Sequence, residues 1–187
     1  MIYLFGSLSN PNIITLTKRL RDEGLTVFSE WHSSGPEADM HWKNYFKELG
    51  YSYKEALNSD FVNTAFNFDL DHMKQADIGV LVMPAGRSGH LEIGWMLGQG
   101  KKGYILFPDG EPERPDLMAK LATDVFFSTE ELINVLNMQR DRQNRGAEPP
   151  ANQFRQISNT NPGLHFNHPR LGISCACADC ERSLGNP

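Results

Sequence analysis

Residues 76–107 constrain the fold of this chain most strongly, because two short apolar runs there flank a glycine-rich turn and a helical segment. The runs 78–83 and 103–107 have the length of buried strands, and residues 88–99 between them predict a helix. A strand, a helix and a second strand at this spacing are typical of two parallel strands joined by a crossover helix. The expected fold class is therefore α/β.

The same alternation extends to both sides of this segment. Asn10 is a suitable N-cap and Pro11 a suitable first residue for one helix. Further strands are expected at 2–5, 25–28 and 124–127, and further helices at 11–23, 41–57, 60–75, 115–121 and 129–137. Together they predict a compact three-layer sandwich with a central, mostly parallel five-stranded sheet of the Rossmann-like or flavodoxin-like type. A ligand site is expected where the first strand and the strand 78–83 end.

Composition divides the 187 residues into one domain, 1–140, which is expected to be the catalytic one, and a polar tail, 141–187. The tail contains enough ligands for a zinc ion, although their spacing matches no standard finger and incidental cysteines remain the alternative. These candidate ligands are His165, His168, Cys175, Cys177 and Cys180. No metal or other cofactor is expected in the domain itself.

The net charge of −5 argues against a partner that is a nucleic acid polymer, which would require a basic face. No apolar run is long enough to span a membrane, so no membrane partner is expected. The three cysteines all lie in the tail, which suits the reducing cytoplasm. The expected location is therefore cytoplasmic.

Glu92 is the main candidate for catalysis, because it stands alone between apolar residues at the start of the predicted helix 88–99. In the first turn of a helix, the helix dipole would keep its carboxylate ionised. An ionised carboxylate in a partly dry pocket is a candidate nucleophile. The alternative is a helix-start acid that serves only the dipole.

Asp69 is the second candidate, because it lies on the apolar stripe of the predicted helix 60–75 together with Val62, Phe66 and Met73. A carboxyl group on such a stripe faces the interior, and burial raises its pKa, which suits it to hold or deliver a proton. Asp71 is the nearby alternative, but it points away from this stripe.

The residues around Glu92 resemble the nucleoside 2-deoxyribosyltransferase family and the related deoxynucleoside 5′-monophosphate N-hydrolases. The resemblance rests on Ala76 and Asp77 before the strand, the spacing from Gly89 through Glu92 to Gly94, and Gly100 with Lys101 before the next strand. It covers about residues 1–137. It implies that Glu92 attacks the anomeric carbon and forms a glycosyl–enzyme intermediate, while Asp69 assists the leaving base or the sugar.

The resemblance also assigns further residues to the substrate. Gly6 and Ser7 would line the pocket, and Ser88 would contact a phosphate. Apart from the resemblance, the guanidinium group of Arg87 could hold a phosphate or a carboxylate, with a solvated turn as the alternative. The residue type itself, and not the resemblance, indicates that Gly89 and Gly94 would leave room for the sugar, because glycine has no Cβ atom. Asp116 and Met118 would reach the pocket of a neighbouring subunit, which implies a homodimer or higher homo-oligomer; a simple helix-start acid is the alternative for Asp116.

The expected function is therefore cleavage or transfer of the N-glycosidic bond of a (deoxy)nucleoside or its 5′-monophosphate, with this small molecule as the partner. Aromatic residues are candidates for stacking on the base, although ordinary packing is the alternative for at least half of them; they are Trp31, His32, Trp42, Tyr45, Tyr51 and Tyr53. Two other functions remain open: a non-catalytic nucleotide-binding or signalling domain of the same architecture, and an NAD-type dinucleotide glycohydrolase.

Overall fold

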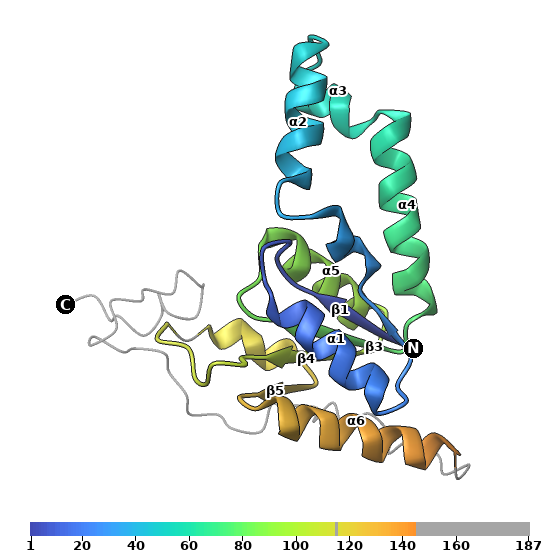
Figure 1. Ribbon diagram of the computed structural model, residues 1–187, viewed down its shortest axis with the longest axis vertical. Coiled ribbons are helices and arrows are strands. Elements are labelled where there is room, and N and C mark those ends of the chain that lie inside the picture. The colour runs from blue at the N-terminus through green and yellow to red at the C-terminus, as the bar shows by residue number, and fades with distance from the viewer. Residues whose placement is uncertain (115, 145–187) are drawn as a thin grey trace, which may run out of the picture. The chain divides into compact units, whose positions relative to one another are not determined.

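The computed structural model of the protein describes residues 1–114 and 116–144 (Figure 1). The described residues belong to the first of the two units into which the chain divides, Met1–Ala147 and Glu148–Pro187. The candidate zinc ligands between 165 and 180 lie outside the described residues.

A single sheet of five short strands forms the centre of this unit. The strands are β1 (Ile2–Phe5), β2 (Val27–Phe28), β3 (Ile78–Val82), β4 (Lys102–Leu106) and β5 (Asp124–Phe126), in the order β2-β1-β3-β4-β5. Every neighbouring pair is parallel, with Ile2 opposite Ile78 and Ile78 opposite Lys102. The predicted α/β fold is therefore confirmed, and its strand order is the flavodoxin-like one.

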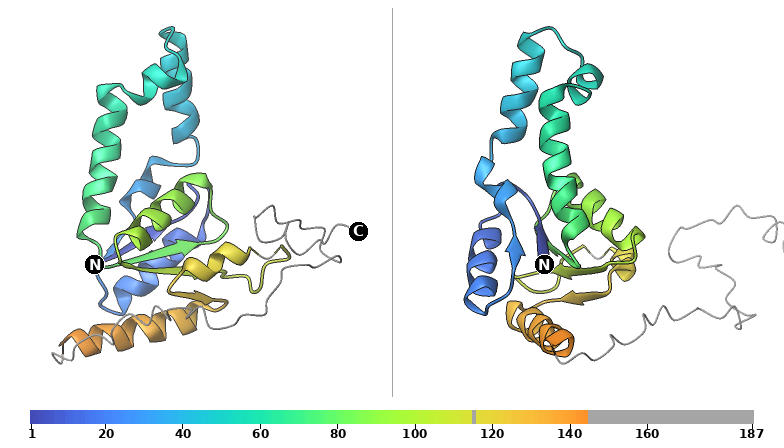
Figure 2. Two further views of the ribbon diagram at one scale, coloured as in Figure 1. Left: turned by 180° about the vertical axis from the view of Figure 1, so that it is seen from behind. Right: turned by 90° about the vertical axis from the view of Figure 1, so that its right-hand side faces the viewer.

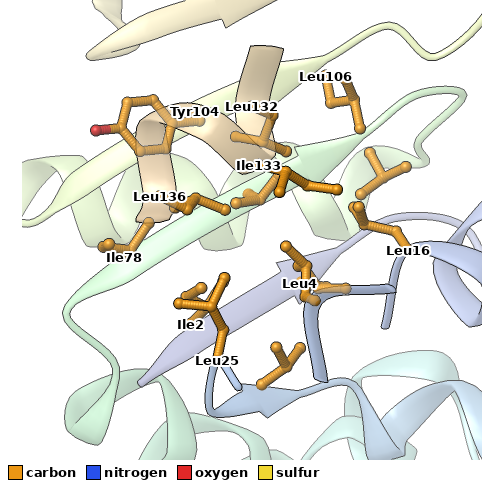
Figure 3. Close-up of a cluster of buried hydrophobic side chains, with 14 of the residues drawn as sticks. Ile2, Leu4, Leu16, Leu25, Ile78, Tyr104, Leu106, Leu132, Ile133 and Leu136 are labelled. Atoms are coloured by element: carbon orange, nitrogen blue, oxygen red, sulfur yellow. The ribbon is translucent and has the colours of Figure 1, made fainter. Parts of the chain in front are cut away.

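The alternation of side chains along β1 separates two apolar cores. Ile2 and Leu4 pack toward α1 (Asn12–Asp22) and α6 (Thr129–Asn144), in the cluster drawn in Figure 3. Tyr3 and Phe5 point to the other face, which is covered by the end of α4 (Asp60–Gln75) and by α5 (Arg87–Gly98). The candidate catalytic residues belong to α4 and α5, so they lie on the same face as Tyr3.

Between β2 and β3 the chain departs from its predicted course. The predicted helix 41–57 is two helices, α2 (Ala38–Glu48) and α3 (Tyr53–Leu57), because Gly50 adopts a left-handed conformation with φ of 80°. Ser52 then begins α3 with a capping box, in which its side chain and that of Glu55 bind each other's backbone N–H groups. The segment between β2 and α2 contains the 3-10 helix η1 (Glu30–Ser34).

Helices α2, α3 and the first half of α4 form an arm that projects from the sheet (Figure 2). Phe46 is the centre of this arm and is only 6% exposed. The rings of Trp42, Tyr45, Tyr51 and Phe61 surround it, with centroid distances of 5.3–6.4 Å. The arm is therefore held together by an aromatic cluster of its own, distinct from the two cores of the sheet.

Smaller differences concern the ends of elements. The predicted helix 115–121 is the 3-10 helix η2 (Leu117–Leu121), and α6 continues past the predicted end at 137 to Asn144. Pro11, not Asn10, occupies the cap position of α1. No helix among the described residues is both long enough and apolar enough to cross a membrane.

Candidate functional site

The candidate site lies where β1 and β3 end side by side, the point at which the strand order of the sheet reverses. In a parallel α/β sheet this position opens a crevice between the two following loops. Asn10 ties the loops together: its Nδ2 donates to the carbonyl oxygens of Val82 and Pro84, each at 3.1 Å. Its Oδ1 accepts from the backbone N–H of Asn12 at 3.0 Å, so this buried side chain fixes the loop before α1 as well.

A cavity of about 1180 Å³ opens above this point and extends into the arm. Gly6 and Ser7 line it from the loop after β1, and Arg87, Ser88 and Glu92 line it from α5. Helix α4 contributes Asp69 and a stripe of five residues nearer its start, which are Asp60, Phe61, Thr64, Ala65 and Phe68. Six of the predicted site residues therefore share one cavity, although they come from three separate segments of the chain.

Glu92 is the sixth residue of α5 and lies in its second turn, so the expectation that the helix start keeps it ionised is wrong. Its pKa is instead raised to about 7, mainly because burial removes water from the carboxylate and also because the negative charge of Asp69 is near. At neutral pH this carboxyl group is therefore close to the midpoint of its titration.

Asp69 faces the same cavity from α4, as the apolar stripe predicts. Burial raises its pKa, while the nearby His72 and Tyr3 act in the opposite direction. Asp71 is exposed instead, and its Oδ1 accepts from Nζ of Lys74 at 2.9 Å. The structure thus separates the two aspartates, and only Asp69 lies beside Glu92.

Tyr3 is a site residue that the sequence reasoning missed. Its hydroxyl group is buried, and burial together with the charges of Asp69 and Glu92 raises its pKa strongly. The Asp69 carboxylate is the nearby acceptor for this hydroxyl group, although the contact between them does not have the geometry of a hydrogen bond. The alternation in β1 contained a signal, because Tyr3 is the polar-tipped residue on the face that receives α4 and α5.

Lys101 holds α4 in place, which gives a structural role to the pair Gly100 and Lys101. Its Nζ donates to the carbonyl oxygens of Met73, Lys74 and Ala76 at 2.8, 2.5 and 2.6 Å. A cation at the end of a helix satisfies its free carbonyl groups and its dipole. Because Lys101 directly precedes β4, this contact fixes the end of α4 on the sheet and so the position of Asp69 relative to α5.

The two glycines near Glu92 do not make room for a ligand in the way expected. Gly89 is buried below the cavity, where a Cβ atom would lie 2.9 Å from Leu81 Cδ1 and 3.5 Å from the backbone nitrogen of Gly6. It therefore permits close packing of α5 on β3 and on the loop after β1. Gly94 is exposed and has open space around it, so it borders neither the sheet nor the cavity.

Asp116 and Met118 lie outside the cavity of their own chain. Asp116 begins η2, and its Oδ1 accepts from the backbone N–H of Met118 at 2.9 Å. Met118 is 55% exposed, next to Leu117 at 82% and near Leu121 at 66%. This short helix therefore presents apolar side chains to the solvent.

The cavity is acidic and partly aromatic. Five acids line it, Glu30, Asp39, Asp60, Asp69 and Glu92, against one base, Arg87. Glu30 pairs with Arg21, whereas Arg87 has no ion pair with another described residue. Of the aromatic candidates, Trp31 and Trp42 line the cavity, while His32, Tyr45, Tyr51 and Tyr53 do not.

No group of histidine, cysteine and acidic residues able to hold a metal ion occurs within residues 1–114 and 116–144. The described part of the site therefore consists of carboxyl groups, hydroxyl groups, one guanidinium group and aromatic rings.

A solved structure with similar architecture is that of a 2-deoxyribosyltransferase from Bacillus psychrosaccharolyticus. The two chains share 25% sequence identity with a TM-score of 0.51, and the match covers 71% of this chain and 90% of that one. No protein-family model matches the sequence, and no curated protein matches it. The similarity establishes a relationship at the level of the fold.

Proposed function

We propose that this protein cleaves or transfers the N-glycosidic bond of a (deoxy)nucleoside. The observation that carries the proposal is the pair Glu92 and Asp69, two half-buried carboxyl groups with raised pKa values that face one cavity at the switch point of the sheet. The similarity in fold to a 2-deoxyribosyltransferase supports the same reaction class.

In the proposed first step, an ionised Glu92 oxygen forms a bond to C1′ of the sugar while the bond from C1′ to the base nitrogen breaks. The electron pair of the broken bond leaves with the base. The transition state has oxocarbenium character, and a carboxylate beneath the ring stabilises that charge before it traps the sugar as an ester. Attack by water or by a second base then releases Glu92.

Asp69 is proposed to handle the proton of the base. Its raised pKa makes the protonated form more accessible than in an exposed aspartate. In the fraction of molecules in which Asp69 is protonated and Glu92 is ionised, the Asp69 carboxyl group can donate to the base nitrogen as the bond breaks. Tyr3 is proposed to position the two carboxyl groups, because its buried hydroxyl group is near enough to both of them for their charges to raise its pKa.

The charge of the cavity favours a substrate without phosphate groups. Arg87 and Ser88 at the start of α5 can bind one anionic group. The surrounding carboxylates, however, oppose the multiple charges of a dinucleotide. A deoxynucleoside is therefore the preferred substrate, a 5′-monophosphate is second, and NAD is the least suited.

The protein is further proposed to act as a homodimer or higher homo-oligomer in which Asp116 and Met118 complete the pocket of a partner chain. The exposed apolar side chains of η2 support this arrangement, because a contiguous apolar surface of this kind is commonly buried between subunits.

The function is tested by incubating the protein with deoxynucleosides, their 5′-monophosphates and NAD, and by measuring free base. Deoxynucleosides should release base, and Glu92→Gln should abolish the release. A 2-fluorinated deoxyribonucleoside, which slows breakdown of the ester, should leave a sugar adduct on the peptide that contains Glu92. Absence of release from every compound would favour a binding domain, and an adduct on Asp69 would reassign the nucleophile.

A further inference from the structure

The cavity is longer than the site of bond cleavage requires. On α4 its lining begins at Asp60 and ends at Asp69, which spans about 13 Å at the rise of an α-helix. Trp42 of α2 lies across from this stripe. We define the part lined by Asp39, Trp42, Asp60, Phe61 and Thr64 as the arm cleft. None of its residues has a part in the proposed chemistry.

The direction of the reaction places the base toward the arm cleft. In a displacement at C1′, the leaving group departs on the side opposite the nucleophile. Glu92 attacks from α5, at the end of the cavity that rests on the sheet, and the cavity extends from there into the arm. A substituent on the base, and not on the sugar, therefore enters the arm cleft.

The walls of the arm cleft combine aromatic rings with unpaired carboxylates. The side chains of Asp39 and Asp60 make no hydrogen bond or ion pair with another residue of the described chain. Phe61 is 63% exposed although it lines a cavity, and Trp42 stacks on Tyr53 with a centroid distance of 6.1 Å. Rings held in place next to carboxylates are the chemistry that binds organic cations.

The single cation of the cavity does not neutralise this region. Arg87 begins α5, at the end of the cavity formed by the loops of the sheet. The lining contains no lysine and no histidine. We therefore propose that the arm cleft is a subsite for a cationic substituent on the nucleobase, so that the preferred substrates are N-glycosides whose base has a positively charged side chain. This inference rests on the proposed function.

The test compares two ligands that differ only at the end of the hexyl chain, which is a charged amine in N6-(6-aminohexyl)-2′-deoxyadenosine and a neutral acetamide in N6-(6-acetamidohexyl)-2′-deoxyadenosine, with 2′-deoxyadenosine as the reference. The corresponding N4-substituted deoxycytidines form a second series, so that the choice of base does not decide the result. Dissociation constants by calorimetry and base release are measured separately at pH 8, where the amine is protonated.

The aminohexyl ligand should bind at least tenfold more tightly than the acetamidohexyl ligand, and the ratio should fall as salt concentration rises. Asp60→Asn should reduce the ratio at least threefold and leave base release from 2′-deoxyadenosine unchanged. Asp71→Asn is the matched control, because it removes the same charge from α4 outside the cavity, and it should leave the ratio unchanged.

The inference would be overturned if the two ligands bound equally, or if both bound more weakly than the reference in each series. It would also be overturned if neither series bound measurably, or if Asp60→Asn left the ratio unchanged. A high ratio without base release from any nucleoside would support the subsite and refute the proposed reaction. Base release together with a binding ratio of one would support the proposed reaction and refute the subsite.

Discussion

At the scale of single residues, the proposed role of Glu92 as nucleophile places two opposing requirements on its carboxyl group. A nucleophile must be ionised, whereas burial beside Asp69 favours its protonated form and raises its pKa to about 7. A desolvated carboxylate is a stronger nucleophile than a solvated one, because it is not stabilised by water. In the proposed reaction, burial would therefore make the ionised carboxylate more reactive and lower the fraction of molecules in which Glu92 is ionised.

The pH dependence of kcat/KM should reflect this balance. Activity should rise with pH through about 7, since only the ionised form of Glu92 can attack C1′. Asp69→Asn removes the nearby negative charge, so the rising limb of its residual activity should move to lower pH, and its maximum should fall by about 10²–10⁴-fold if Asp69 protonates the base. Asp71→Asn should match the wild type in both respects. An unshifted limb in Asp69→Asn would show that the two carboxyl groups are not coupled.

Glu92→Gln should abolish base release and yet increase the stability of the fold above neutral pH. A group whose pKa is higher in the folded than in the unfolded state binds more protons when folded, so its contribution to folding becomes less favourable as pH rises from about 4.5 to 7. The variant should therefore be more stable than the wild type at pH 8, by at most about 3 kcal/mol, and equal to it at pH 4. Denaturant unfolding at both pH values measures this difference. A variant that is less stable at pH 8 would contradict the desolvation of Glu92.

At the scale of elements, the arm depends on its own aromatic cluster. Phe46→Ala removes the ring at the centre of this cluster, and a buried phenylalanine contributes about 3–5 kcal/mol. Hydrogen exchange in α2 and α3 should therefore accelerate strongly, while exchange in β1, β3 and β4 should remain slow. KM should rise more than kcat falls, because the arm forms one wall of the cavity but contains no proposed catalytic residue.

Tyr45→Ala is the matched control for this prediction. Tyr45 precedes Phe46 on α2 and is 58% exposed, so its loss should change exchange in the arm only slightly. Equal effects of the two substitutions, or faster exchange throughout the sheet in Phe46→Ala, would show that the arm is not a separate cooperative unit.

At the scale of the whole molecule, the proposed sharing of Asp116 predicts complementation between chains. Glu92→Ala and Asp116→Ala should each be inactive alone. After subunit exchange, mixed oligomers should recover up to about a quarter of wild-type activity in dimers, because some pockets then contain both intact residues. Light scattering and activity measurements on the mixture test this. A monomer in solution, or no recovery after verified exchange, would contradict the arrangement.

The division of the chain predicts that the first unit folds alone. All five strands and both covering layers are complete by Asn144, the end of α6. A chain that ends at residue 144 should therefore show a cooperative unfolding transition and retain base release. If the cysteines of the tail bind zinc, metal analysis should find about one equivalent in the full chain and none in the shortened one. Loss of cooperative unfolding in the shortened chain would contradict this independence.

The sequence by itself determined the order and type of most elements, because short apolar runs and amphipathic stripes depend only on local spacing. It also placed Asp69 on the inner side of α4 and Asp71 on the outer side, since the helical period fixes which residues share a face. The five-stranded parallel sheet follows from the same alternation of strands and helices.

Only the tertiary structure decided the state of Glu92, the role of Tyr3 and the cavity in the arm. The pKa of Glu92 depends on the water removed by α4 and on a charge 23 positions earlier in the chain, at Asp69, and local sequence contains neither. Tyr3 joins the site because β1 pairs with β3 and presents one face to α4 and α5. Gly89 looked like space for a ligand, but the packing of α5 on Leu81 and Gly6 explains it. Burial and proximity arise only when distant segments pack together, which is why these properties required the folded chain.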